Sequence, residues 1–414
     1  MKRYLFLLCL PVLLLTGCAV LLPRPTEAPA VTVAATAVPE VEVPVTEAPT
    51  EAPIQPEPTE PPDYVTSLMQ EMTLRQKVGQ LFIVYPDALD PPPDSSEKCA
   101  TVCTPAMAKA MEEYPVGGII MFGGNIESPE QIKKFNKDLQ ACSDIPLFLC
   151  VDEEGGPVAR LANHKAFDLP KYRSAASVGK SGNPDKALEM GRTIGGYLKE
   201  YGFNVDFAPV ADVNTNPKNT IIGSRAFSPK PETAAAMAAA MAEGLREQGI
   251  IPTFKHFPGH GDTAEDSHDG LAVSGKTAVE LSECEWIPFA SATEDDMVMM
   301  GHIALPGLLN DRTPATMSPE VVTGILKNQL GFQGLVVTDS LEMGAITDLY
   351  TSGEAALGAL KAGCDLILMP ADLEKAFDAV VEAYETGTLD AAGLDACVER
   401  ILRFKERHGM LGIG

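Results

Sequence analysis

The stretch LVVTD, Leu335 to Asp339, shows the pattern on which the fold depends. Three apolar residues and a threonine lead directly to a carboxylate, and such a nearly continuous apolar run is typical of a parallel strand buried on both faces. Similar short runs recur along the chain, and most of them are almost wholly hydrophobic. There are eight: Leu81–Tyr85, Gly118–Phe122, Leu147–Asp152, Phe203–Val210, Ile250–His256, Met297–Ile303, Leu335–Asp339 and Asp365–Met369.

Helical patterns lie between most of these runs, and two more follow the last run. They cover 128–141, 184–201, 230–249, 318–329, 352–362, 372–386 and 391–408. Eight strand–helix units over roughly 350 residues predict an α/β protein with a single (β/α)8 barrel of the TIM type, carrying insertions. The alternative is a doubly wound open sheet, but no GxGxxG follows the first run, and eight units close more naturally into a barrel. The longest insertion, 86–113, follows the first run and has no recognisable fold.

The N-terminal segment, 1–18, has the features of an export signal. Lys2 and Arg3 precede the apolar run Leu5–Leu15, which is too short to span a membrane, and small residues follow it. The sequence Leu-Thr-Gly-Cys, ending at Cys18, resembles the lipobox of bacterial lipoproteins. We therefore expect an exported protein whose lipid anchor at Cys18 is its only link to the membrane, on the outer face of the cytoplasmic membrane.

Residues 19–62 are rich in proline, glutamate and threonine, and Thr-Glu-Ala-Pro occurs three times, at 26–29, 46–49 and 50–53. This composition cannot bury a hydrophobic core, so it predicts a disordered, extended linker. The catalytic domain is expected to cover the remaining residues, 63–414.

The net charge of −25 argues against nucleic acid as a partner, because phosphate binding needs clustered lysines and arginines. Of nine cysteines, Cys99 and Cys103 are candidates for a disulfide in an oxidising compartment. The chain has no pair of CxxC motifs, which makes a structural zinc site improbable.

Ionisable residues stand at the ends of four predicted strands. Asp152 ends the third, Lys255 and His256 end the fifth, His302 is near the end of the sixth, and Asp339 ends the seventh. In a barrel, the carboxyl ends of the strands share one rim, and that rim carries the active site. Glycoside hydrolysis requires a carboxylate at the reacting carbon and a separate proton donor, and this rim could hold both. Asp339 could instead cap the following helix.

The stretch FKHFPGHGDTAEDSHDG, 254–270, offers that proton donor. His268 has Asp266 two residues before it, and a neighbouring carboxylate raises the proton affinity of a histidine. A metal site is the alternative, with His256 and His260 four residues apart. Pro258 and Gly259 disfavour the helix that would align them, so we expect no metal and no cofactor. For His260 we favour a role in loop architecture, and for His302 a packed or pocket-shaping role.

Several long motifs, in order, resemble those of glycoside hydrolase family 3, in its β-N-acetylhexosaminidase branch. They are TLRQKVGQLF at 73–82, VDEEGGPVARL at 151–161, IIGSRAFS at 221–228, KHFPGHGDTAEDSH at 255–268 and LVVTDSLEMGAI at 335–346. The resemblance covers roughly residues 64 to 410.

The resemblance implies a retaining mechanism through a covalent glycosyl-enzyme. Asp339 is then the nucleophile, and His268 with Asp266 the acid/base pair. It also implies that the terminal sugar binds to five residues, which are Asp152, Arg160, Arg225, Lys255 and His256. The implied substrates are terminal N-acetyl-β-D-hexosamines, such as those of peptidoglycan fragments.

Two rival functions remain open. One is a β-glucosidase or β-xylosidase of the same family; those enzymes usually take a glutamate acid/base from a second domain, and this chain ends shortly after its last predicted helix. The other is a sugar-binding lipoprotein without catalysis, although such proteins normally have two lobes around a hinge. The sequence leaves the aglycone and the oligomeric state undetermined.

Overall fold

The computed structural model describes residues 63–91, 99–263 and 270–411, all of which belong to one unit, Pro61–Gly414. The predicted signal, Cys18 and the linker therefore lie outside the described residues. Among the described residues, no helix is long and apolar enough to cross a membrane.

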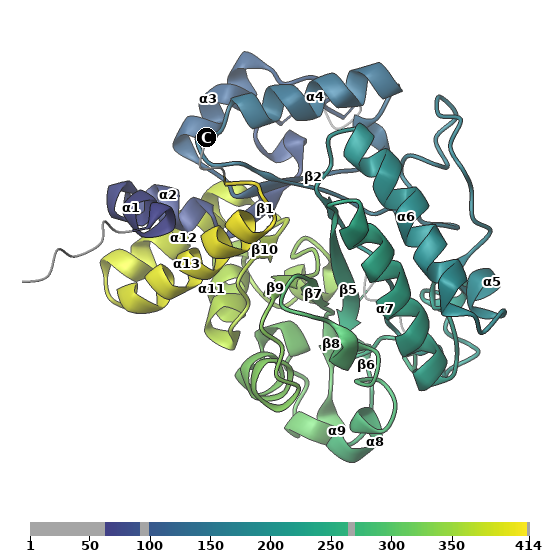
Figure 1. Cartoon of the computed structure of the whole chain (residues 1–414). Helices are drawn as coiled ribbons and strands as arrows, with labels where there is room; N and C mark the ends of the chain where they lie inside the picture. The colour runs from purple at the N-terminus through teal and green to yellow at the C-terminus, as the bar shows by residue number, and fades with distance from the viewer. Residues whose placement is uncertain (1–62, 92–98, 264–269, 412–414) are drawn as a thin grey trace, which may run out of the picture. The chain divides into compact units, whose positions relative to one another are not determined.

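Eight parallel strands form the central sheet in the order β10-β1-β2-β3-β4-β5-β7-β9 (Figure 1). Seven of them lie within predicted runs, and β5 extends one residue beyond its run, so the eight predicted strands and the α/β class are confirmed. Their bounds are β1 Phe82–Val84, β2 Gly118–Met121, β3 Phe148–Val151, β4 Val205–Asp206, β5 Ile251–Phe257, β7 Met297–Met300, β9 Leu335–Thr338 and β10 Ile367–Leu368.

The first and last strands of this order meet and close the sheet. Val337 forms a parallel bridge with Leu366, and the Thr338 N–H donates to the Leu366 carbonyl at 3.0 Å. Further along the chain, the Leu341 N–H donates to the Leu368 carbonyl at 3.0 Å. A closed sheet of eight parallel strands is the (β/α)8 barrel that the sequence predicts.

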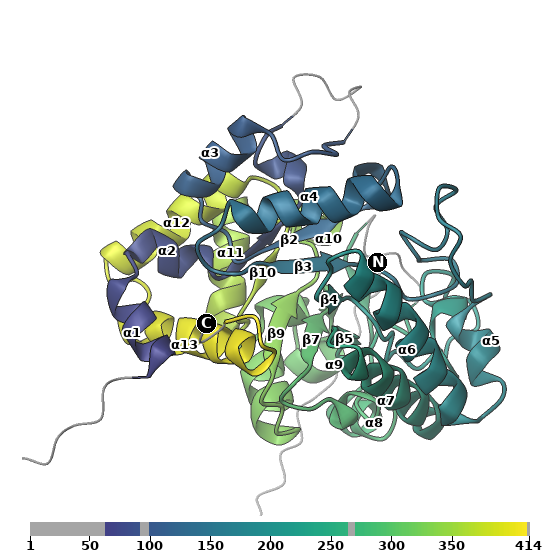
Figure 2. The same ribbon diagram turned by 45° about the horizontal axis from the view of Figure 1, so that its top comes forward.

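Helices surround the strands, with α12 and α13 on one side and α6 and α7 on the other (Figure 2). The predicted helices are present, and 318–329 contains a π-helix, η6, instead of an α-helix. The bounds are α4 Pro129–Ala141, α6 Pro184–Glu200, α7 Pro231–Glu247, η6 Glu320–Gln329, α11 Ser352–Ala362, α12 Leu373–Glu385 and α13 Ala391–Arg407.

Capping residues explain where several helices begin and end. Ser128 accepts a hydrogen bond from the Gln131 N–H at the start of α4, and Thr351 forms a capping box with Glu354 at the start of α11. Gly363 ends α11 in the left-handed conformation, with φ of 109°.

The helices α6 and α7 approach each other closely through glycines. A Cβ at Gly191 would lie 2.1 Å from the Met241 carbonyl oxygen, and one at Gly244 would lie 2.3 Å from the Leu188 carbonyl oxygen. Only glycine fits at both positions, and α7 in turn packs on β5.

The smaller elements were not predicted. These are α1 Tyr64–Glu71, α2 Leu74–Gly79, α5 Ala175–Gly179, α8 Ala278–Ser282, α9 Pro306–Leu309, α10 Gly344–Thr347 and the two-stranded sheet of β6 Ala272–Val273 and β8 Ile303–Ala304. The 86–113 insertion contains a 3₁₀ turn, Pro86–Ala88, and the helix α3, Pro105–Glu113, where no fold was predicted.

Cys99 and Cys103, the predicted candidates for a disulfide, are both free thiols. The Cys103 Sγ lies 3.5 Å from the Cys142 Sγ, at the end of α4. Among the described cysteines, Cys142 is therefore the neighbour of Cys103, because the insertion folds back onto α4.

Candidate active site

A cavity of about 330 Å³ opens at the carboxyl ends of the strands. Its walls come from the strands β2, β5, β7 and β10 and from the loops that follow β2, β3, β4, β5, β9 and β10. Six of the predicted site residues line it: Asp152, Arg160, Arg225, Lys255, His256 and Asp339. The rim that the barrel prediction singled out is therefore the place where these side chains meet.

A network of four charged groups forms one wall. The Lys255 Nζ lies 2.7 Å from Asp152 Oδ1 and 2.7 Å from Glu154 Oε1. Arg225 donates to both oxygens of Glu154, from Nε at 2.9 Å and from Nη2 at 2.7 Å. Glu154 and Lys255 are each only 2% exposed, so these contacts are shielded from water.

The network keeps Glu154 and Lys255 charged in spite of burial. Burial alone would raise the pKa of Glu154, but Lys255 and Arg225 hold it well below its usual value. Burial likewise opposes protonation of Lys255, yet Asp152 and Glu154 raise its pKa above the usual value. A carboxylate and an ammonium kept charged beside a cavity can make strong hydrogen bonds to sugar hydroxyls.

The loop after β3 is shaped to bring Asp152 and Glu154 to the cavity. Between them Glu153 points the other way, and its carboxylate accepts from the Leu161 and Ala162 N–H groups, both at 2.9 Å. Gly155 then turns the chain with φ of 76°. Glu154 was not among the predicted site residues, although the motif VDEEGG contains it.

His256 is oriented by a buried carboxylate that the sequence analysis also missed. The Asp212 Oδ2 lies 2.7 Å from the His256 Nδ1, and Asp212 is fully buried. The Asp212 Oδ1 accepts from the His260 N–H at 2.7 Å. Asp212 therefore fixes both the ring of His256 and the backbone at His260. The Nε2 of His256 faces the Arg225 Nη2 at 3.4 Å.

His260 has both a structural and a cavity-lining position. Its Nδ1 lies 2.7 Å from the Thr263 Oγ1, as expected for a residue that organises its loop, and it also lines the cavity. Burial lowers its pKa, and the neighbouring His256 lowers it further. Thr263 is the last described residue before Asp266 and His268, which lie outside the described residues.

Asp339 directly follows β9 and lines the cavity. Its N–H donates to the Met300 carbonyl at 2.9 Å, and its Oδ1 accepts from the Ser340 N–H at 2.8 Å. Although burial acts in the opposite direction, His256 and the Ser340 N–H help to hold the pKa of Asp339 below its usual value. An ionised carboxylate on a rigid strand end can act as a nucleophile.

Arg160 connects the network to an aromatic wall. Its Nη2 lies 3.3 Å from Asp152 Oδ2, and its guanidinium lies over the Phe122 ring, 5.5 Å from the centroid. Both residues line the cavity.

His302, by contrast, is fully buried behind the cavity, with its Nε2 2.9 Å from the Ser340 carbonyl oxygen and its Nδ1 2.8 Å from the Thr316 Oγ1. His302 packs beneath the segment that carries Asp339, and this is the packed position that the sequence analysis favoured for it.

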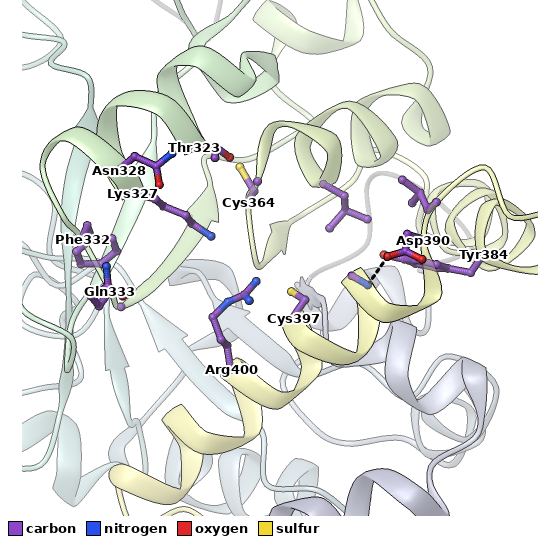
Figure 3. A pocket seen from close by; sticks show the side chains of 15 residues that line it. Thr323, Lys327, Asn328, Phe332, Gln333, Cys364, Tyr384, Asp390, Cys397 and Arg400 are labelled. Atoms are coloured by element: carbon purple, nitrogen blue, oxygen red, sulfur yellow. Dashed lines mark hydrogen bonds between the residues drawn. The ribbon is translucent and has the colours of Figure 1, made fainter. Parts of the chain in front are cut away.

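A separate cavity, of about 450 Å³, lies near the amino ends of β9 and β10 (Figure 3). Lys327 and Arg400 point toward one another there and share the buried carboxylate of Asp365 at 3.0 and 2.8 Å. Asp365 also accepts from the Val336 N–H at 2.9 Å. These groups tie the barrel to η6 and α13, at the end where barrels carry stabilising contacts.

The described residues contain no group of histidine, cysteine and carboxylate side chains that could hold a metal ion. In the first cavity, the ionised carboxylate of Asp339 lies in the same cavity as the charged wall of Asp152, Glu154, Arg225 and Lys255. Its volume suits a single sugar ring, whose hydroxyls the wall could bind while the ring's reactive carbon faces Asp339.

Comparison with known proteins gives consistent relatives. Residues 73–404 match the model of the glycosyl hydrolase family 3 N-terminal domain. The chain is 31% identical over 375 residues to beta-hexosaminidase A of Pseudoalteromonas piscicida, covering 83% of this chain and 63% of that protein. It is 34% identical over 306 residues to beta-hexosaminidase LpqI of Mycobacterium tuberculosis, covering 70% and 76%.

Among solved structures, a family 3 beta-N-acetylglucosaminidase from Paenibacillus sp. is similar, with a TM-score of 0.76 and 35% identity, over 83% of this chain and 64% of that one. The chain thus spans just under two thirds of that protein and of the Pseudoalteromonas relative. The family match extends over most of the barrel, and the barrel carries the charged cavity just described: the chain belongs to glycosyl hydrolase family 3.

Proposed function

We propose that this chain is a retaining, exo-acting β-N-acetylglucosaminidase that releases terminal non-reducing N-acetyl-β-D-hexosamine residues. The observation that carries the proposal is Asp339, an ionised carboxylate at the end of β9, facing a cavity with room for one sugar. The names of the relatives, beta-hexosaminidase and beta-N-acetylglucosaminidase, support the choice of sugar over a glucose or xylose.

In the proposed reaction an Asp339 oxygen attacks the anomeric carbon and forms an ester bond to it. The glycosidic bond breaks, and the leaving oxygen takes a proton from His268. Water then attacks the same carbon, His268 takes the water proton, and the bond to Asp339 breaks, which restores the starting configuration. Asp266 is the proposed partner that raises the proton affinity of His268.

The network of Asp152, Glu154, Arg225 and Lys255 is proposed to bind the hydroxyls of the terminal sugar, with Arg160 and His256 beside it. Hydrogen bonds to charged groups in a water-poor cavity are strong and directional, so they place the anomeric carbon against Asp339. The proposed mechanism needs no metal and no cofactor.

The proposed setting is the outer face of a bacterial cytoplasmic membrane, with the chain anchored through Cys18 and held away from the lipid by residues 19–62. Peptidoglycan fragments are the proposed natural substrates, because they carry N-acetylglucosamine and occur at that surface. This part of the proposal rests on the sequence of residues 1–62 alone.

Two measurements test the function. Aryl β-N-acetylglucosaminide should be hydrolysed with a higher kcat/KM than the matching aryl β-glucoside; the reverse order would favour a family 3 β-glucosidase. A slow fluorinated substrate should label Asp339, as seen by mass spectrometry of peptides, and Asp339→Asn should lose both the label and turnover. Label on a different residue would refute the assignment of the nucleophile.

A further inference from the structure

A larger cavity, of about 720 Å³, adjoins the candidate active site. The two cavities share three lining residues: Phe122, Glu342 and Met369. The remaining walls come from the segment after β1, including Tyr85 and Asp87, and from the start of α12, including Leu373. A molecule that enters the first cavity can therefore extend into the second without leaving the protein surface.

The position of Glu342 relates the second cavity to the reaction. Glu342 is three residues after Asp339, and its exposed side chain lies on the wall between the two cavities. If the terminal sugar places its anomeric carbon at Asp339, the group attached to that carbon leaves toward this wall. The second cavity is large enough for the next sugar of the chain.

The lining of the second cavity combines apolar faces with negative charge. Phe122, Tyr85 and Leu373 offer the apolar surface against which a sugar ring packs, while every charged side chain among its described lining residues is a carboxylate: Asp87, Glu342, Asp372 and Glu374.

Two of these carboxylates already have partners within the protein. Asp87 accepts hydrogen bonds from the Ala100 N–H and the Asn125 Nδ2, and Asp372 caps α12 and pairs with Lys375 at 2.7 Å. Glu342 makes no ion pair with a described residue, and it faces both cavities. Its effect on Tyr85 shows how near it is: burial raises the pKa of the phenol, and the Glu342 carboxylate raises it further.

We propose that the second cavity is the subsite for the leaving-group sugar, and that Glu342 makes this subsite select a neutral or amine-bearing sugar over one with a free carboxylate. This inference rests on the proposed function. A carboxylate on the leaving sugar would stand beside Glu342 and be repelled, whereas hydroxyls or an ammonium would form hydrogen bonds with it. A muramic acid whose carboxylate is bound in an amide would avoid the repulsion.

The test compares three disaccharides with the same terminal N-acetylglucosamine and different reducing sugars: N-acetylglucosamine, glucosamine and muramic acid with a free carboxylate. An aryl β-N-acetylglucosaminide serves as the reference substrate. At low ionic strength, kcat/KM for the carboxylate-bearing disaccharide should be at least about tenfold below that for the neutral one, and salt should narrow the gap because it screens charge.

Glu342→Gln should reduce that gap to about twofold, because it removes the charge and keeps the shape. Glu385→Gln is the matched control: it changes the net charge equally, at an exposed position on α12 that lines neither cavity. It should leave the gap unchanged.

The outcomes separate the two proposals. If the aryl substrate and all three disaccharides resist the wild-type protein, the proposed function is wrong. If they are hydrolysed but the wild-type protein shows no gap, or Glu342→Gln leaves the gap as Glu385→Gln does, the function stands and the inference about the subsite is overturned.

Discussion

Two buried lysines, at opposite ends of the barrel, differ in whether carboxylates lie beside them. Lys255, at the carboxyl ends of the strands, contacts two carboxylates, and these raise its pKa. Lys405 on α13 is fully buried at the other end, where its Nζ donates to the Gln80 Oε1 at 2.8 Å and to the Gly117 carbonyl at 3.1 Å. No described carboxylate pairs with it, and burial lowers its pKa to about 7.

The different pKa values of the two lysines show at which end of the barrel a buried lysine is kept charged. Gly117 directly precedes β2, so Lys405 fills the closed end of the barrel, with its Nζ over the Phe148 ring at 4.6 Å. There a neutral amine that satisfies two oxygens is sufficient. At the cavity, burial is just as deep, yet Asp152 and Glu154 keep Lys255 charged. Buried charge that is maintained by partners, next to a cavity, indicates a binding role.

Lys255→Met should have the largest effect of the changes that probe this comparison. It removes the ammonium that is proposed to bind a sugar hydroxyl, and a hydrogen bond to a charged group contributes about 1.5–3 kcal/mol. We expect kcat/KM on an aryl β-N-acetylglucosaminide to fall roughly tenfold to a hundredfold, since 1.4 kcal/mol is a factor of ten.

The matched control for this change is Lys405→Met, the same substitution at the other end of the barrel. It should keep the wild-type kcat/KM within about twofold, because Lys405 lines neither the active-site cavity nor its neighbour. A comparable loss of activity in both variants would mean that lysine burial, and not the partners of Lys255, explains the effect.

Much of the fold could be predicted because its signals are local. The run LVVTD became β9, and the other seven runs became strands, since a strand buried on both faces must be apolar along its length. The pair β6–β8 has two residues in each strand, too few for any periodicity. The π-helix at 320–329 keeps the amphipathic pattern of an ordinary helix, so its different hydrogen bonding left no mark in the sequence.

The site divides in the same way. Asp152, Lys255, His256 and Asp339 could be located by the rule that strands deliver active-site residues at their carboxyl ends. Asp212 follows the fourth run in the same manner, and the same rule applied there would have indicated it. Glu154 was missed because its role depends on contacts with Lys255 and Arg225, which lie far from it in the sequence. Arg160 and Arg225 came from the family resemblance, and the structure brings both to the cavity.

The contacts of Lys405 could not have been predicted from the sequence. A lysine near the end of a helix normally satisfies the last carbonyl groups and faces water. Its burial results from α13 packing across the barrel end, a contact between residues more than 280 positions apart. The spacing of Val398 and Ile401 places Lys405 on the buried face of α13, but it does not indicate which oxygens accept from its Nζ.

Lys405→Met should stabilise the protein near neutral pH, by an amount that depends on pH. With a folded pKa of about 7 and an unfolded pKa of about 10.4, the unfolded chain binds one more proton between these values. Wild-type stability therefore gains about 1.4 kcal/mol per pH unit from this lysine as pH rises through the window, and the lysine imposes its full penalty below pH 7.

Urea unfolding at several pH values between 7 and 10 measures this effect. The advantage of Lys405→Met over wild type should be about 2 kcal/mol near pH 7, because the stranded Gln80 oxygen offsets part of the gain, and should shrink and reverse as pH rises. Comparing the two proteins at each pH removes the contribution of other titrating groups. A constant difference across the range would show that Lys405 stays charged in the folded protein.

Gln80→Glu should have the smallest effect on stability, and it tests most directly why the pKa values of Lys255 and Lys405 differ. It places a carboxylate where the Gln80 Oε1 now lies, 2.8 Å from the Lys405 Nζ, so this lysine acquires the kind of partner that Lys255 has. Stability at pH 7 should change by less than about 1 kcal/mol, because the attraction between buried charges roughly offsets the cost of removing them from water. The pKa of Lys405 should rise, so the gain in stability between pH 7 and 10 should disappear. Gln80→Met, which removes the amide without adding charge, should retain that gain. If Gln80→Glu also retains it, the partner carboxylates do not account for the different pKa values of the two lysines.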